Sequence, residues 1–133
     1  MVKIVSKYKA GFPGEGADLK INRSSPLYAC SDIVANCSSA TAWTRKARND
    51  RDNLEYDNLD LFNLALAAAR DGRYKNSEWC QSKPGGPWAA CDAYSLVRIE
   101  RDHENEKDYR CEYYVKFGIS DTGTVLLIVS CHL

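Results

Sequence analysis

Six cysteines and two histidines are the side chains of this sequence whose types could support chemistry. The cysteines are separated by 6, 42, 10, 19 and 19 residues, whereas structural zinc sites use cysteines two to four residues apart. No Cys-x-x-Cys motif, the signature of a dithiol redox centre, occurs either. The spacing therefore predicts disulfide bonds and argues against a metal or another cofactor. The cysteines are Cys30, Cys37, Cys80, Cys91, Cys111 and Cys131.

The two histidines, His103 and His132, are the candidates for a general base, which a nucleophilic Ser or Cys would need nearby. His103 lies in the charged stretch ERDHENEKD, which is typical of a solvated turn. On a strand His132 points to the opposite face from Cys131, and therefore away from the core. The sequence thus favours a protein that is not an enzyme. The alternative is a small secreted hydrolase or toxin, for example nuclease-like, that uses these histidines with nearby carboxylates.

A predicted hairpin gives one cysteine pairing. The segments CEYYVKFGIS and TVLLIVSC are rich in residues that favour strands, and the turn sequence SDTG spans their junction. A turn centred on Asp121–Thr122 places Cys111 almost opposite Cys131, within disulfide reach. We therefore expect this bridge, and one face of the hairpin should be buried, namely Tyr113, Val115, Leu127 and Val129.

Two further pairings are expected. The prolines and glycines of CQSKPGGPWAAC, residues 80–91, can turn the chain back on itself, which favours a Cys80–Cys91 bridge. Elimination leaves Cys30–Cys37. That pair requires the helix around it to break near Asn36, because seven helical residues span about 10 Å.

The loop inside residues 80–91 is the predicted binding site. A bridged loop with two prolines loses little entropy on binding, and Trp is frequent at binding hot spots. We expect the loop to form part of a partner-facing surface; in the alternative, its tryptophan folds inward and caps the core. The predicted contacts are Lys83, Pro84, Gly85, Gly86, Pro87 and Trp88.

Charge and cysteine content indicate the kind of partner and the compartment. Eighteen basic and eighteen acidic side chains cancel, so we expect no attraction to nucleic acid, and the basic run TRKARNDR (44–51) is interpreted as a solvated helix face. No apolar run approaches the roughly 20 residues of a membrane span. Paired cysteines predict a secreted or periplasmic protein whose signal peptide is absent from this sequence. A reduced cytosolic protein with buried thiols is the alternative.

Periodicity predicts an α+β fold made of one domain, residues 1–133. Helices are expected to start at Ser25–Pro26, to run over 40–51, and to begin after Asp57 in DNLDLFNLALAAARDG. Strand-like runs follow at 93–101, 108–119 and 124–132. We expect the N-terminal helices to pack on a C-terminal antiparallel meander of three to four strands, stapled by disulfides.

The segment CEYYVKFGISDTGTVLLIVSC resembles the last hairpin of secreted type-2 cystatins in its cysteine separation and in the Gly-Thr after the turn. The similarity covers about a sixth of the chain, and the Gln-x-Val-x-Gly and Pro-Trp motifs of that family are absent. The resemblance therefore implies no site residues. The leading hypothesis is an exported protein-binding module, a small inhibitor or immunity-type protein that blocks a partner enzyme or toxin.

Overall fold

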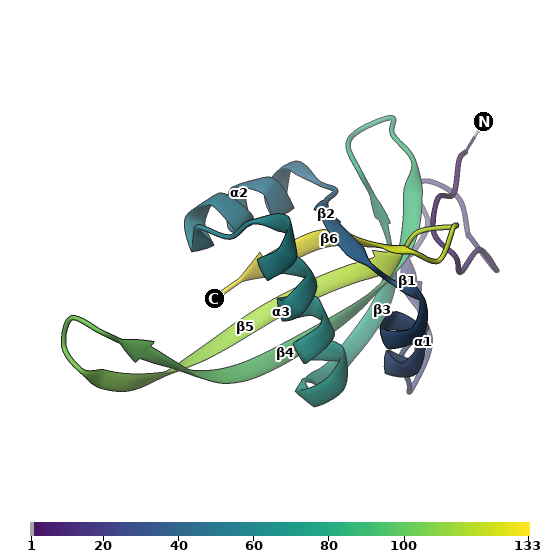
Figure 1. The fold of residues 1–133 in the computed structure, drawn as a ribbon. Coiled ribbons are helices and arrows are strands. Elements are labelled where there is room, and N and C mark those ends of the chain that lie inside the picture. Colours follow the sequence, from purple (N-terminus) through teal and green to yellow (C-terminus); the bar gives the residue numbers. More distant parts are fainter. Residues whose placement is uncertain (1) are drawn as a thin grey trace.

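A computed structural model describes residues 2–133, in which three helices accompany one six-stranded sheet (Figure 1). The strands lie in the order β1-β3-β4-β5-β6-β2, and every pair is antiparallel except β2 with β6. The α+β class is confirmed, but the sheet is mixed and larger than the expected meander. The elements are β1 (Lys20–Ile21), α1 (Cys30–Asn36), β2 (Ser39–Ala42), α2 (Arg45–Leu54), α3 (Asn58–Asp71), β3 (Arg73–Gln81), β4 (Trp88–Asp102), β5 (Lys107–Ile119) and β6 (Val125–His132).

Helix α3 crosses one face of the sheet and forms the centre of the main core (Figure 1). Its start is fixed by a capping box: the Asp57 carboxylate accepts from the Asp60 backbone N–H at 2.8 Å, and Asp60 accepts from the Asp57 N–H at 3.0 Å. The predicted start after Asp57 is thus confirmed. The buried stripe of the helix consists of Leu61, Leu64, Ala65 and Ala68, while Leu59 at its amino end is exposed.

The other two helices begin later than predicted. Helix α1 starts at Cys30, not at Ser25–Pro26, and residues 39–42 form strand β2 before α2 starts at Arg45. The Thr44 hydroxyl accepts from the Ala47 N–H at 3.0 Å and acts as the N-cap of α2. Strand β2 gains its hydrogen bonds from β6, which is distant in sequence, so the local pattern alone did not reveal it.

A buried carboxylate, that of Asp92 on β4, ties the chain before α1 to the sheet. Its oxygens accept from the backbone N–H groups of Leu27 and Tyr28 at 3.0 and 3.1 Å, and from the Ser77 hydroxyl at 2.6 Å. Burial raises the pKa of Asp92, and these three hydrogen bonds oppose that rise. The carboxylate thus satisfies donors that would otherwise be buried without partners.

The hairpin of β5 and β6 has a different register from the one predicted. The Ser120 N–H donates to the Val125 carbonyl, so four residues form the loop and not two. A bulge beside Lys116 then shifts the pairing by one more residue, and Cys131 lies opposite Val115. Cys111 is four residues away along β5, roughly 13 Å at strand spacing. The expected Cys111–Cys131 contact is therefore wrong. The shift also makes Leu126 and Ile128 the core residues of β6, whereas Leu127 is buried on the other face.

All six cysteines lie within the described residues, and each is a free thiol. The expected Cys30–Cys37 contact is wrong because α1 continues unbroken through Asn36, which keeps the two residues at opposite ends of the helix. Cys37 instead lies near the turn of the last hairpin, where its thiol is 3.4 Å from the carbonyl oxygen of Gly123. No disulfide staples this fold as it stands in the structure.

We expect Asp92→Asn to lower the free energy of unfolding by about 1–3 kcal/mol, because one amide N–H₂ must then face a backbone donor. Urea denaturation followed by circular dichroism measures the change. Asp108→Asn, on an exposed part of β5, is the matched control and should change stability by less than about 0.5 kcal/mol. Equal effects of the two variants would contradict the anchoring role of Asp92.

Candidate functional site

The loop of residues 82–87 joins β3 to β4 and projects beyond the sheet (Figure 1). The Gly86 N–H donates to the Lys83 carbonyl at 2.8 Å, and Gly85 has a φ of 77°, so Pro84 and Gly85 are the central residues of a type II turn. The Gln81 side-chain amide also donates to the Gly86 carbonyl, at 2.9 Å. The predicted loop is therefore rigid without a disulfide, and residues 83–85 are exposed.

Trp88 is buried, with 6% of its surface exposed, and is not the contact residue that the binding prediction included. Its ring packs against Phe12 at a centroid distance of 5.3 Å, and Phe12 also contacts the buried Trp79 at 5.1 Å. The Trp88 backbone N–H donates to the Lys3 carbonyl, so the amino-terminal segment covers the tryptophan. The inward alternative is correct for this residue.

Helix α2 stands next to the loop and is fastened to the edge of β6. The Thr44 hydroxyl donates to the Val129 carbonyl at 2.6 Å, and the buried Asp50 carboxylate accepts from the Cys131 N–H at 3.0 Å. These side chains bond β6 beyond the point where its neighbour β2 ends. Hydrogen bonds from the N-cap residue and from the second turn thus set the orientation of α2.

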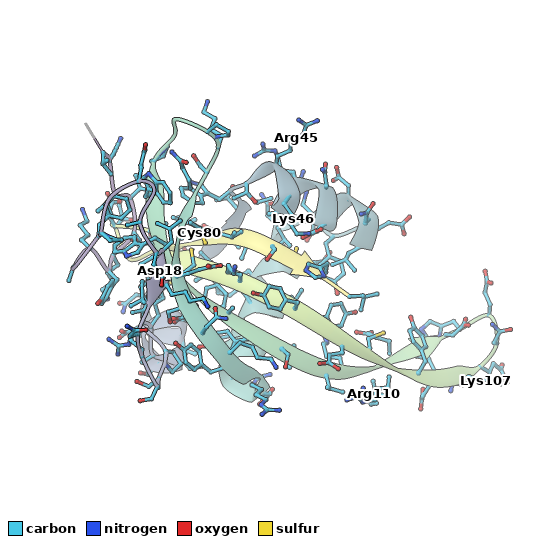
Figure 2. The ribbon with its side chains drawn as sticks, turned by 180° about the vertical axis from the view of Figure 1, so that it is seen from behind. Asp18, Arg45, Lys46, Cys80, Lys107 and Arg110 are labelled. Atoms are coloured by element: carbon cyan, nitrogen blue, oxygen red, sulfur yellow. The ribbon has the colours of Figure 1, made fainter. Side chains whose placement is uncertain are left out.

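A pocket of about 510 Å³ lies between the first turns of α2 and the β3–β4 loop. Helix α2 contributes Arg45, Lys46 and Arg48 to its wall, and the loop contributes Lys83. Figure 2 shows Arg45 and Lys46 on α2, with Cys80 at the base of the hairpin that carries the loop. We call these four side chains the cationic cluster. They come from two segments some 35 positions apart in the sequence.

Few carboxylates of this protein neutralise the charge of the cationic cluster. Lys46 pairs with Asp50 at 3.0 Å, but among residues 2–133 the other three cations form no ion pair. The first turn of α2 holds no acidic residue, although the positive end of a helix dipole favours acids there. The pocket wall therefore carries a concentrated positive charge and can attract anionic groups.

The predicted pair Cys80 and Cys91 lies beneath the loop. Glu78 is opposite Cys91 and Cys80 is opposite Ala89, so the two thiols are diagonal neighbours on one face of the hairpin. Burial raises the pKa of Cys91, and contact with the Cys80 thiol raises it further. Gly118 on β5 lies against Cys91: a Cβ at position 118 would be 2.6 Å from the Ala90 carbonyl oxygen and 3.3 Å from the Cys91 sulfur, so there is no room for a larger residue than glycine there.

An ion pair between Glu78 and Lys116 flanks the two thiols. Burial lowers the pKa of Lys116, but the hydrogen bond to Glu78 and the nearby Cys80 outweigh it and leave that pKa raised. Cys131 on β6 is another buried thiol. Burial and the nearby Asp50 carboxylate raise the pKa of Cys131 to about 12, so it stays protonated at neutral pH.

The structure does not bring the two histidines together. His103 is exposed in the turn at the tip of the β4–β5 arm, whereas His132 lies opposite Tyr114 on β5. Lys107 marks the start of β5 near that tip (Figure 2), seven residues from Tyr114. Seven strand residues span roughly 23 Å, so the histidines cannot share one reacting group.

Comparisons with protein-family models, with curated proteins and with solved structures give no match for this chain. Among residues 2–133, no helix is long and apolar enough to cross a membrane, and no group of three or more His, Cys, Asp or Glu side chains is arranged to hold a metal ion. The fold and site define an α+β protein with a mixed sheet and a cationic pocket beside a rigid hairpin loop.

The sequence revealed half of this site. The loop was predicted from its prolines and glycines, whereas the three cations of α2 were interpreted as a solvated helix face. The signal for them was the run TRKARNDR, in which three cations come before the first acid. The sequence alone does not show that this run and the loop line the same pocket, because their proximity depends on the order of strands in the sheet.

We expect Trp88→Ala to lower the free energy of unfolding by about 3–5 kcal/mol, because it removes a large buried ring. Lys83→Ala, at an exposed position of the same loop, is the control and should shift stability by less than about 0.5 kcal/mol. Thermal and urea unfolding of the two variants test this. A Trp88→Ala protein as stable as the wild type would mean that the ring is not part of the core.

Proposed function

We propose that this protein is an exported protein-binding module of the small inhibitor or immunity type, which blocks a partner enzyme or toxin. The observation that carries the proposal is the rigid, projecting β3–β4 loop beside the pocket. The contact residues are those of the loop that are exposed, Lys83, Pro84 and Gly85.

The physical support for a binding role is pre-organisation. A flexible loop loses conformational entropy when it is ordered against a partner, and this loss weakens affinity. Here the type II turn and the bond from the Gln81 side chain already fix the loop. The loop also extends away from the sheet, where a partner can approach it without disturbing the core (Figure 1).

Export is proposed together with a Cys80–Cys91 disulfide, the one expected pair whose thiols are in contact. Diagonal Cα atoms lie about 7–8 Å apart, so the hairpin must tighten by about 1 Å to form the bond. Each thiol loses a proton and an S–S bond forms. The two electrons reduce a disulfide-type oxidant, such as oxidised glutathione, to two thiols.

A photo-crosslinking amino acid placed at position 83 should join the protein to one partner in extracts of the source cells, since the loop is the contact surface. The same amino acid at position 107, on the distant arm, is the control. The purified partner should then bind with an affinity at least tenfold weaker after Lys83→Glu, and its own enzymatic or toxic activity should fall on binding. Adducts that are equal at both positions, or an unchanged affinity, would contradict the proposal.

In a glutathione redox buffer set to an oxidising potential, we expect the number of free thiols to fall from six to four. Non-reducing peptide mapping should assign the new bond to Cys80 and Cys91, and the closed loop should raise the free energy of unfolding by about 3 kcal/mol. The Cys80→Ser variant should keep all its remaining thiols free. Six free thiols under these conditions, or a bond between Cys111 and Cys131, would show the pairing to be wrong.

A further inference from the structure

The cationic cluster has the properties of a binding site for a group with several negative charges. Arg45, Lys46 and Arg48 are exposed on α2, and Lys83 is exposed across the pocket from them. Two walls from separate elements can therefore contact one anionic group from two sides. Of the four cations in the cluster, only Lys46 has a carboxylate partner among the described residues. That partner, Asp50, is buried and also accepts a hydrogen bond from the backbone of β6.

The walls of this pocket are held in place before any ligand arrives. Thr44 and Asp50 fasten α2 to β6, and the type II turn fixes the loop that carries Lys83. Cations on fixed supports are brought together without the entropy cost of ordering two flexible segments. The volume of about 510 Å³ accommodates several side chains of a peptide, more than a single small ion needs.

We propose that this pocket binds an acidic segment of a protein partner, rich in Asp and Glu, through the carboxylates of that segment. The proposal rests on the proposed function and names the chemistry of the partner. Guanidinium groups such as those of Arg45 and Arg48 match carboxylates with two parallel hydrogen bonds. An acidic peptide therefore supplies the complementary charge and the complementary geometry.

The same pocket is poorly suited to single-stranded nucleic acid. Binding of that kind uses aromatic rings on which bases stack, and the residues that line this pocket include no aromatic side chain. The chain as a whole has a formal net charge of +0, so there is no long-range field to attract a polyanion. A localised cluster on a neutral protein favours a short charged segment that is delivered by a larger protein interface.

The expected affinity for a peptide alone is modest and depends on salt. Exposed ion pairs contribute little individually, typically 0.2–1 kcal/mol, and salt screens them over about 10 Å at 0.1 M. Several pairs on fixed supports add to a measurable affinity at low ionic strength. Raising the salt from about 50 to 300 mM should therefore weaken binding several-fold.

The test uses a fluorescein-labelled hexaglutamate peptide, with hexaglutamine as the uncharged control, and measures fluorescence anisotropy with the full chain. The double variant Arg45→Glu/Lys83→Glu should weaken hexaglutamate binding at least tenfold. The matched double variant Lys107→Glu/Arg110→Glu, on the arm at the other end of the molecule (Figure 2), changes net charge equally and should leave the affinity within about twofold. Because all four side chains are exposed, neither double variant should lower the melting temperature, and the glutamate at position 45 should raise it slightly through the dipole of α2.

Equal losses in the two double variants would show only a net-charge effect and would overturn the proposal, as would binding of hexaglutamine as tight as that of hexaglutamate. A single-stranded oligonucleotide with six phosphates that binds the pocket more tightly than hexaglutamate would also overturn it. The crosslinking experiment fails independently of this one. Hexaglutamate binding without a partner adduct at position 83 rejects the proposed function and leaves only the affinity of the pocket for carboxylates, whereas an adduct without hexaglutamate binding rejects the acidic segment alone.

Discussion

The position of α2 depends on two hydrogen bonds from its side chains to the backbone of β6. Strand β2 pairs with β6 only as far as Ile128, and beyond that point this edge of β6 has no neighbouring strand, although its other edge stays paired with β5. The Thr44 hydroxyl and the Asp50 carboxylate take the place of that strand by bonding the Val129 carbonyl and the Cys131 N–H. Since a buried N–H without a partner is costly, the helix is held where it completes the sheet. The first wall of the pocket follows from this constraint.

The parts of the fold that could be predicted are those whose signals are local. The start of α3 was predicted from Asp57, a residue that favours the N-cap position, and the capping box that Asp57 forms with Asp60 lies within four residues. Strands β4, β5 and β6 were predicted from their β-branched and aromatic residues. Strand β3 was missed because its sequence, RYKNSEWCQ, is mostly polar and lies near the edge of the sheet, where pairing with β4 and not hydrophobicity makes it a strand.

The error in the Cys111–Cys131 pairing arises because the register of a hairpin is a cumulative property. A loop two residues longer than assumed and one bulge beside Lys116 together moved the partner of Cys131 to Val115. Neither feature has a strong sequence signal, because Asp-Thr-Gly suits several loop lengths. The pair Cys80 and Cys91 was less sensitive to such errors. Its turn contains Pro-Gly, which favours a type II turn, and the register shift between β3 and β4 lies near Tyr74, outside the part of the hairpin between the cysteines and the turn.

The candidate site shows where local stability and binding make different demands. A helix shaped for stability alone would place acids in its first turn, where they interact favourably with the helix dipole, yet α2 begins with Arg45 and Lys46. Each such cation forgoes up to about 1 kcal/mol at this end of a helix. The first turn of α3 holds Asp60, so the chain does follow the rule in that helix. The departure from local preference thus coincides with the concave cationic surface, and disagreements of this kind between levels are most expected at functional sites.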